Sequence, residues 1–208
     1  MSSRILVVAE HDGSKLNVST AKAVTCATKV PGATVDVVVL AADASALAAQ
    51  AAAIAGVAKV LQKIAEAEQP FMVLLGKQAI DEDNGQTAQM LAALLDRPQA
   101  VSCSKLEVTD GKARVTREVD TGLETLEIDL PAVLSVDLRL NEPRYVKLPD
   151  IMKAKKKPLD VKGLGDFGVA EGSTFKTVKV EPPPARSKGI MVKDVAELVG
   201  ALKQKGLV

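Results

Sequence analysis

FMVLLGKQAIDEDNGQTAQMLAALL, residues Phe71–Leu95, combines three features that decide the fold class. Its first part, Phe71–Leu75, is a short apolar run of the kind that forms a fully buried parallel strand. A polar turn follows, and Gln86–Leu95 has the apolar spacing of a helix. A buried strand that leads through a turn into a helix is the repeating unit of α/β proteins with a parallel sheet and right-handed crossovers.

Similar units precede this stretch. Two further apolar runs, Ile5–Ala9 and Thr34–Leu40, predict buried strands. Helices are expected in three segments: Val18–Thr28, Ser45–Ala55 and Val57–Gln69. Asn17 is the expected N-cap of the first helix. Gly56 is expected to end the helix at Ser45–Ala55 and so to separate it from the helix at Val57–Gln69.

The pattern changes after the helix at Gln86–Leu95. Short strands are expected at Ser102–Val108, Ala113–Val119 and Thr125–Ile128, separated by turn residues. Pro131–Val136 then predicts a returning buried strand. We therefore expect an α/β fold, with a mostly parallel sheet flanked by helices. An antiparallel extension and a C-terminal arm complete it.

Composition excludes several classes of function. The formal net charge is +1 and aromatic residues make up 2%, so we expect neither a nucleic-acid-binding field nor stacking platforms for single strands. Cys26, Cys103 and His11 are too few for a zinc or iron–sulfur site and favour a reducing compartment. We expect no signal peptide and no membrane insertion, because no apolar run reaches the roughly 20 residues that span a bilayer.

The turn Gly76–Thr87 is the strongest candidate site. It follows the carboxyl end of a predicted parallel strand, where open α/β sheets bind ligands. The helix that begins after it offers free amides and a dipole that suit a phosphate. Two glycines allow close backbone approach, and polar side chains are available for base, ribose or phosphate: Gly76, Gly85, Gln78, Asn84 and Gln86. A helix cap beside a solvated acidic turn is the alternative, and paired carboxylates such as Asp81 and Asp83 fit capping or ribose contact better than acid–base catalysis.

A second candidate site lies in Arg139–Lys157, where apolar residues stand beside a run of lysines. Apolar anchors inside a basic rim suit docking onto an acidic protein surface, although a solvated loop has the same pattern. Gly163–Gly168 matches GxGxxG but follows no buried strand, so we interpret it as a loop. The long C-terminal segment, with a helix expected at Val192–Gln204, has little core of its own and is expected to lie on another chain.

Several long motifs closely resemble the small (beta) subunit of electron-transferring flavoprotein. They are VLLGKQAIDEDNGQTAQMLAALL at Val73–Leu95, GLETL at Gly122–Leu126, LPAV at Leu130–Val133, DLRLNEPRY at Asp137–Tyr145, LPDIMKAKKK at Leu148–Lys157 and PPPAR at Pro182–Arg186. The resemblance covers about Val57–Val208. Over about Met1–Leu61 the sequence is instead similar to the start of the family's large (alpha) subunit, and the small subunit's usual Asn-Pro-Phe/Tyr motif is absent. The chain therefore resembles a hybrid, or chimera, joined near Ala55–Leu61.

The resemblance implies an electron carrier subunit, not an enzyme, with no catalytic side chain and no metal site. AMP would bind structurally at Ala9, Gly76, Lys77, Gln78, Asp81, Asp83, Asn84, Gly85, Gln86 and Thr87. FAD would be present only through the large subunit of a heterodimer. Acyl-CoA dehydrogenases of fatty acid beta-oxidation would dock on Leu148, Pro149, Ile151, Met152, Lys153 and Lys156, and the two lysines match positions that are methylated in the family.

The resemblance thus implies an α/β AMP-binding domain over residues 1–140, with an adenine nucleotide alpha hydrolase-like or Rossmann-like arrangement. A dehydrogenase recognition loop is expected over 141–160 and an arm for the partner subunit over 161–208. The expected location is the mitochondrial matrix or the bacterial cytoplasm. Two other functions remain open. One is a stand-alone nucleotide-binding module of the universal-stress type, with ATP at the same turn, and the other is an engineered chimera that keeps the fold without electron transfer.

Overall fold

The fold was determined from a computed structural model, which describes residues 3–9, 16, 18–39, 50–79, 83–169, 179, 181–182, 185–186 and 188–208. These residues belong to two compact units, Met1–Lys176 and Thr177–Val208. Each unit is described by itself.

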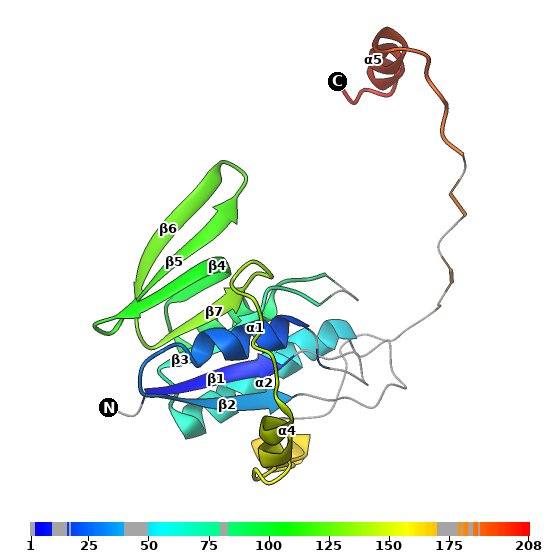
Figure 1. Cartoon of the computed structure of the whole chain (residues 1–208). Coiled ribbons are helices and arrows are strands. Elements are labelled where there is room, and N and C mark those ends of the chain that lie inside the picture. Colours follow the sequence, from blue (N-terminus) through cyan, green and yellow to red (C-terminus); the bar gives the residue numbers. More distant parts are fainter. Residues whose placement is uncertain are drawn as a thin grey trace. The chain divides into compact units, whose positions relative to one another are not determined.

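The first unit is built on a seven-stranded sheet with the order β2-β1-β3-β7-β4-β5-β6 (Figure 1). Its strands are β1 (Ser3–Ala9), β2 (Ala33–Val39), β3 (Met72–Gly76), β4 (Gln99–Thr109), β5 (Lys112–Val119), β6 (Gly122–Asp129) and β7 (Ala132–Val136). Pairing is parallel from β2 through to β4 and antiparallel from β4 through β5 to β6. The predicted fold class is confirmed, including the antiparallel extension.

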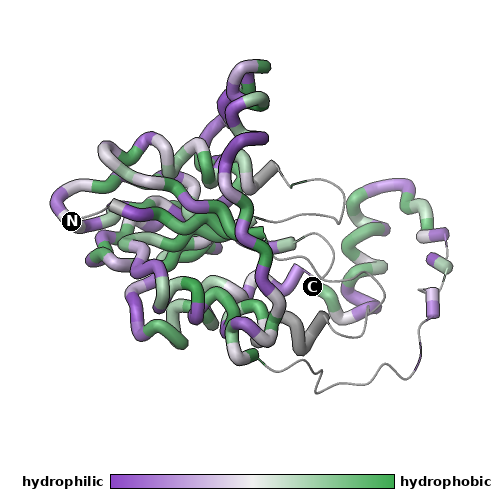
Figure 2. Tube along the Cα trace, turned by 90° about the horizontal axis from the view of Figure 1, so that it is seen from below, coloured by the Kyte–Doolittle hydropathy of each residue, from purple (hydrophilic) through white to green (hydrophobic). Residues whose placement is uncertain are grey.

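Helices cover both faces of the parallel part of the sheet. On one face Ile5 and Val7 of β1 share a core with Ala23 and Ala27 of α1 (Val18–Ala27). On the other face the alternate β1 residues pack with α2 (Gln50–Glu68) and α3 (Thr87–Leu95). The period-two alternation of a strand places successive side chains in opposite cores, which explains why β1 is apolar from Ile5 to Ala9. Figure 2 shows hydrophobic residues along these central strands.

The central strands β1, β3 and β7 match the prediction closely. Every residue of β7 is buried, and β3 is buried from Met72 to Leu75. β7 lies between β3 and β4, so the strand at Pro131–Val136 does return to the middle of the sheet.

Two expectations were wrong in part. β2 was predicted to be buried, but it is an edge strand and Val39 is 51% exposed. An edge strand lacks a neighbour on one side, and its apolar composition alone does not reveal this. Gly56 was expected to break a helix, yet α2 runs through it without interruption. One glycine costs a helix only about 1 kcal/mol, and the alanine-rich flanks offset that cost. The residues at 45–49, together with Asn17 and Leu40, lie outside the described residues.

Two short helices follow β7, in a region where the sequence shows no helical periodicity. α4 (Leu148–Ala154) begins with a proline in its first turn and has no buried residue. η2 (Leu164–Phe167) is a 3₁₀ turn in which Asp166 accepts a hydrogen bond of 2.7 Å from the Gly163 amide. The GxGxxG stretch is therefore a capped turn, consistent with its interpretation as a loop.

The second unit contains α5 (Val195–Gln204). The helix was expected to begin at Val192. It begins three residues later because the Asp194 carboxylate caps it and accepts a hydrogen bond from the Glu197 amide at 2.8 Å. Its apolar residues Val195, Leu198 and Val199 are exposed.

Candidate functional site

The carboxyl ends of three neighbouring parallel strands form the floor of the candidate site. Ala9 ends β1, Gly76 ends β3 and Val136 ends β7. Gly76 is in register with Val136, and the Lys77 amide donates to the Val136 carbonyl at 3.0 Å. The β3 ladder therefore continues one residue into the turn and fixes where the turn leaves the sheet.

The turn closes on itself before α3 begins. The Asp83 amide donates to the Ala79 carbonyl at 3.0 Å, and both Asp83 and Gly85 have a φ of +57°. A Cβ atom added at Gly85 would lie 3.5 Å from the Lys77 carbonyl oxygen, which is ordinary van der Waals contact. Left-handed backbone is available to glycine at little cost and is tolerated by aspartate. These two residues therefore allow the chain to bend back toward the end of β3.

The start of α3 has the properties of an anion site. Its N-cap residue is Gln86, whose side chain makes no capping hydrogen bond, and its first turn carries no acidic residue. The first amides of a helix have no partner within the helix, and its dipole favours negative charge there. α3 is held firmly against the sheet because Ala88, Leu91 and Ala92 are buried. The arrangement could hold a phosphate without a charged side chain.

Those residues of the predicted AMP site that the structure describes lie close together. Those at 76–79 and 83–87 form one turn, and Lys77, Gln78, Asp83, Asn84 and Gln86 are solvent-exposed. Ala9, at the end of the adjacent strand, is buried at the edge of the floor. Asp81 lies outside the described residues. Sequence reasoning missed Gln89, whose buried Oε1 has no hydrogen-bond partner among the described residues and which stands in the first turn of α3.

A polar hollow of about 360 Å³ borders this turn on the side of the antiparallel extension. It is lined by Lys77, Ser102, Glu118, Val119, Asp120, Asp137 and Arg139. The hollow was not predicted. The signal that could have found it is the charged triplet Asp137-Leu138-Arg139, which follows directly on a buried strand and must therefore reach the same sheet edge.

Arg139 joins two carboxylates in this hollow. Its Nε lies 2.8 Å and its Nη2 3.3 Å from the two oxygens of Asp137, and its Nη1 contacts Glu118. The guanidinium hydrogen bond lowers the pKa of the Asp137 carboxyl and raises the pKa of Arg139 itself. Asp137 is thus held as a carboxylate, with its side chain only 13% exposed.

The second predicted site, Arg139–Lys157, contains the short helix α4. Leu148, Ile151 and Met152 stand at i, i+3 and i+4 on α4, so they share one face, and all three are exposed, Leu148 by 71%. Pro149 occupies the first turn, and Lys153 and Lys156 follow at the end of the helix. The structure therefore brings together the apolar residues and lysines that the sequence singled out.

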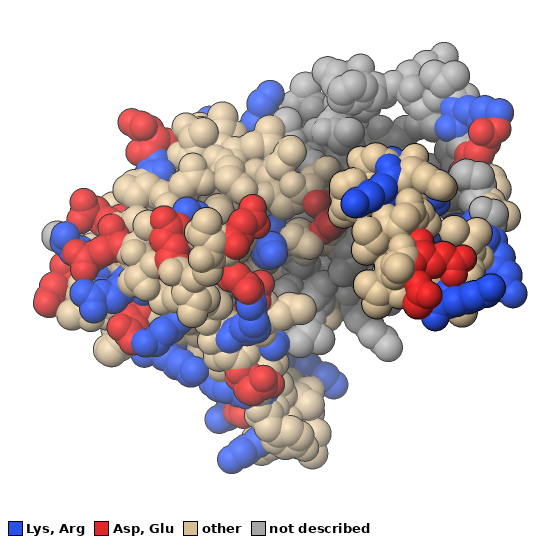
Figure 3. All heavy atoms as spheres, turned by 90° about the horizontal axis from the view of Figure 1, so that it is seen from above, with Lys and Arg blue, Asp and Glu red and all other residues tan. Residues whose placement is uncertain are grey.

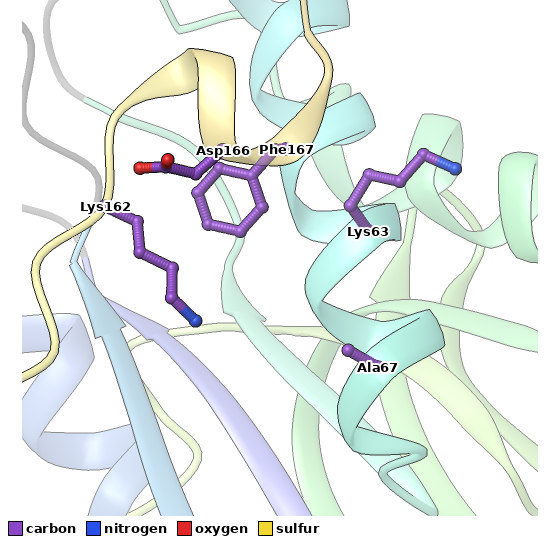
Figure 4. A pocket seen from close by; sticks show the side chains of 5 residues that line it. All are labelled: Lys63, Ala67, Lys162, Asp166 and Phe167. Carbon is purple, nitrogen blue, oxygen red and sulfur yellow. The ribbon is translucent and has the colours of Figure 1, made fainter.

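A second hollow in the described residues is a weaker candidate for a ligand site. A hollow of about 440 Å³ between α2 and η2 is lined by Lys63, Ala67, Lys162, Asp166 and Phe167 (Figure 4). Both lysines are in ion pairs, Lys63 with Glu66 at 2.9 Å and Lys162 with Asp160 at 2.9 Å. The Asp166 carboxylate accepts a hydrogen bond from the Gly163 amide, so the charged groups that line the hollow already have partners.

The two cysteines belong to the core of the described residues. Cys26 and Cys103 are buried free thiols, and burial raises the pKa of Cys103 to about 12. The part of the chain that the structure describes contains no metal-ligand cluster and no helix long and apolar enough to cross a membrane. On the face shown in Figure 3, acidic and basic side chains are interspersed, in keeping with ion pairs such as Lys112–Glu127.

Comparison with known proteins identifies a matching family model, the electron transfer flavoprotein domain, over residues 53–164. The electron transfer flavoprotein subunit beta of Bradyrhizobium diazoefficiens is 54% identical over 144 residues, which cover 69% of this chain and 58% of that protein. The Homo sapiens subunit beta is 51% identical over 144 residues, 69% of this chain and 56% of that protein. The mitochondrial subunit beta of Arabidopsis thaliana is 50% identical over 146 residues, 69% of this chain and 58% of that protein.

The chain thus spans less than two thirds of the length of these relatives. The comparisons give no support to the predicted large-subunit-like start at Met1–Leu61. The family model matches residues 53–164, and the three relatives named above carry the beta-subunit name.

Proposed function

Since this chain belongs to the electron transfer flavoprotein family, as a homologue of its beta subunits, we propose that it is a non-catalytic subunit of an electron carrier. It holds AMP as a structural ligand at the start of α3. It pairs with a flavin-bearing large subunit and docks acyl-CoA dehydrogenases through α4. Electrons pass through the flavin of the partner, and no side chain of this chain makes or breaks a bond.

The observation that carries the nucleotide proposal is the start of α3, which has neither a side-chain cap nor an acidic residue in its first turn. It lies at the carboxyl edge of a parallel sheet, where nucleotides bind in open α/β folds. Gln78, Asn84 and Gln86 are exposed around it and suit the ribose and base. Ala9, Gly76, Lys77, Asp81, Asp83, Gly85 and Thr87 complete the proposed contacts.

The docking proposal is supported by the exposed apolar face of α4. Large apolar side chains at the centre of an interface contribute most of its binding energy, and a charged rim steers the partner. Leu148, Ile151 and Met152 form such a centre, with Lys153 and Lys156 as the rim. The partner surface is therefore expected to be acidic, with an apolar recess.

Release of the bound nucleotide tests the first part. The purified chain is denatured in acid and the supernatant is analysed by mass spectrometry. AMP in near-stoichiometric amount supports the proposal. ATP would favour a stand-alone nucleotide module instead, and no nucleotide would favour a chimera that keeps only the fold.

Electron transfer tests the second part. The chain is co-expressed with a flavin-bearing large subunit, and reduction of the yellow complex by an acyl-CoA dehydrogenase is followed in the visible range. Leu148→Ala is expected to raise the KM for the complex with little change in kcat. Leu123→Ala is the control, because Leu123 is equally exposed at 75% but lies on β6. Equal KM values for the two variants would contradict docking through α4.

A further inference from the structure

The segment between β7 and α4, residues 137–147, is here named the strap. It leaves the sheet edge at the polar hollow and runs along α1 to α4 (Figure 1). α4 itself has no buried residue, so its own packing does not fix its position. The question is which contacts determine where the apolar face of α4 stands.

The strap is tied to α1 at its middle. The Asn141 side chain donates to the Lys22 carbonyl at 3.1 Å, and the Arg144 amide donates to the Thr25 hydroxyl at 3.2 Å. Thr25 is buried, so this acceptor is held in place by the core. Lys22 also donates from its ammonium group to the Leu138 carbonyl. These bonds hold the strap against α1. At its root the Asp137 amide donates to the Cys103 carbonyl at 2.8 Å, and the Leu140 amide donates to the Asp137 carbonyl at 3.1 Å.

Arg139 adds side-chain contacts at the root of the strap. Its backbone amide donates to Asp137 Oδ1 at 2.9 Å, its Nε donates to the same oxygen at 2.8 Å, and its Nη1 reaches Glu118 near the end of β5. One side chain thus links the end of β7, the first turn of the strap and the antiparallel extension. A planar guanidinium that engages two carboxylates defines direction as well as distance.

Beyond Arg144 the strap has little contact with the remainder of the described chain. Tyr145 is 88% exposed, and Val146 and Leu148 are also exposed. Because the strap is held where it leaves β7 and along α1, the direction of these held residues determines where α4 is placed.

We propose that Arg139 is a positioning residue that sets the orientation of the strap and thereby of α4, by binding Asp137 and Glu118 together. This inference rests on the proposed docking role of α4 for its functional consequence. Its structural part, the restraint of the strap by Arg139, stands separately.

The chain contains a natural reporter for the structural part. It has one tyrosine and no tryptophan, and that tyrosine is Tyr145, in the strap. Tyrosine fluorescence anisotropy of the full chain therefore reports the local motion of the strap at Tyr145, added to the tumbling of the whole chain, which is the same in every variant. Arg139→Gln is expected to lower the anisotropy, and Arg139→Lys, which keeps the charge but not the fork, to restore it only in part. Arg114→Gln is the matched control, because it removes an exposed ion pair between Arg114 on β5 and Glu127 on β6, away from the strap.

The functional part is measured in the complex with the flavin-bearing subunit. Arg139→Gln is expected to raise the KM for the dehydrogenase about fivefold with kcat unchanged, on the scale of one exposed charge network. Arg114→Gln should leave both constants unchanged. An unchanged anisotropy in Arg139→Gln overturns the inference, even if Leu148→Ala confirms docking. A lowered anisotropy with unchanged KM in both Arg139→Gln and Leu148→Ala contradicts the docking role, while the restraint of the strap stands.

Discussion

A carboxylate introduced at Gly85 separates phosphate binding from helix stability. Gly85 has a φ of +57°, and a Cβ there would meet the Lys77 carbonyl oxygen at 3.5 Å, so a small side chain fits without a clash. Aspartate tolerates left-handed backbone better than most residues. In Gly85→Asp a negative charge then stands beside the first amides of α3.

The charge acts in opposite directions on the two properties. It favours the helix dipole, which adds about 0.3–1 kcal/mol to stability and offsets much of the cost of replacing glycine. Against a bound phosphate about 6 Å away, it costs about 1–3 kcal/mol at an effective dielectric constant of 20 to 40. We therefore expect the affinity for AMP to fall roughly 10- to 100-fold while the folded state is retained.

Isothermal titration of the nucleotide-stripped chain with AMP measures the affinity, and urea unfolding measures the stability. Gly111→Asp is the control, because Gly111 has a φ of +76° and nothing within 4 Å of its Cβ position, in the turn between β4 and β5. Unchanged AMP affinity in Gly85→Asp, with normal binding in Gly111→Asp, would refute a phosphate at the start of α3.

Three further outcomes are expected. Leu74→Ala should lower the free energy of unfolding by about 2–5 kcal/mol in urea titrations, because Leu74 is fully buried, whereas Leu123→Ala should change it by less than about 0.5 kcal/mol. The pKa of Asp137 is lowered in the folded state. Its contribution to stability is therefore present above the pKa of the unfolded state, near 3.9, and is lost as pH falls through the lower folded pKa. The urea midpoint should therefore decline less on acidification in Asp137→Asn than in the unchanged chain. Burial raises the pKa of Cys103 to about 12, so at pH 8 the native chain should react with a disulfide reagent only at the rate of unfolding, and prompt reaction would contradict its burial.

Much of the fold could be predicted because local pattern and tertiary role agree in the central strands. β1, β3 and β7 are buried on both faces, so their apolar runs predict them directly. β2 has a similar composition but lies at the edge, and no local pattern records how many neighbours a strand has. Gly56 shows the opposite case, since a residue that disfavours helix locally is accommodated within α2.

The candidate site divides in the same way. The turn from Gly76 to Thr87 was predicted because a single strand–turn–helix unit contains all of it. The polar hollow was missed because it joins Lys77, Glu118 and Arg139, which come from three separate parts of the chain. α4 was missed because its one apolar face, at Leu148, Ile151 and Met152, is too short for a periodic signal and remains exposed among the described residues.

The sequence by itself determined the α/β class, the buried strands and the turn that presents the start of α3, because each depends on residues close together in the chain. Tertiary structure alone decided that β2 is an edge, that β7 inserts between β3 and β4, and that Arg139 joins Glu118 to Asp137. These relations depend on which segments become neighbours, and that is set by the packing of the whole sheet and its helices, which no local pattern encodes.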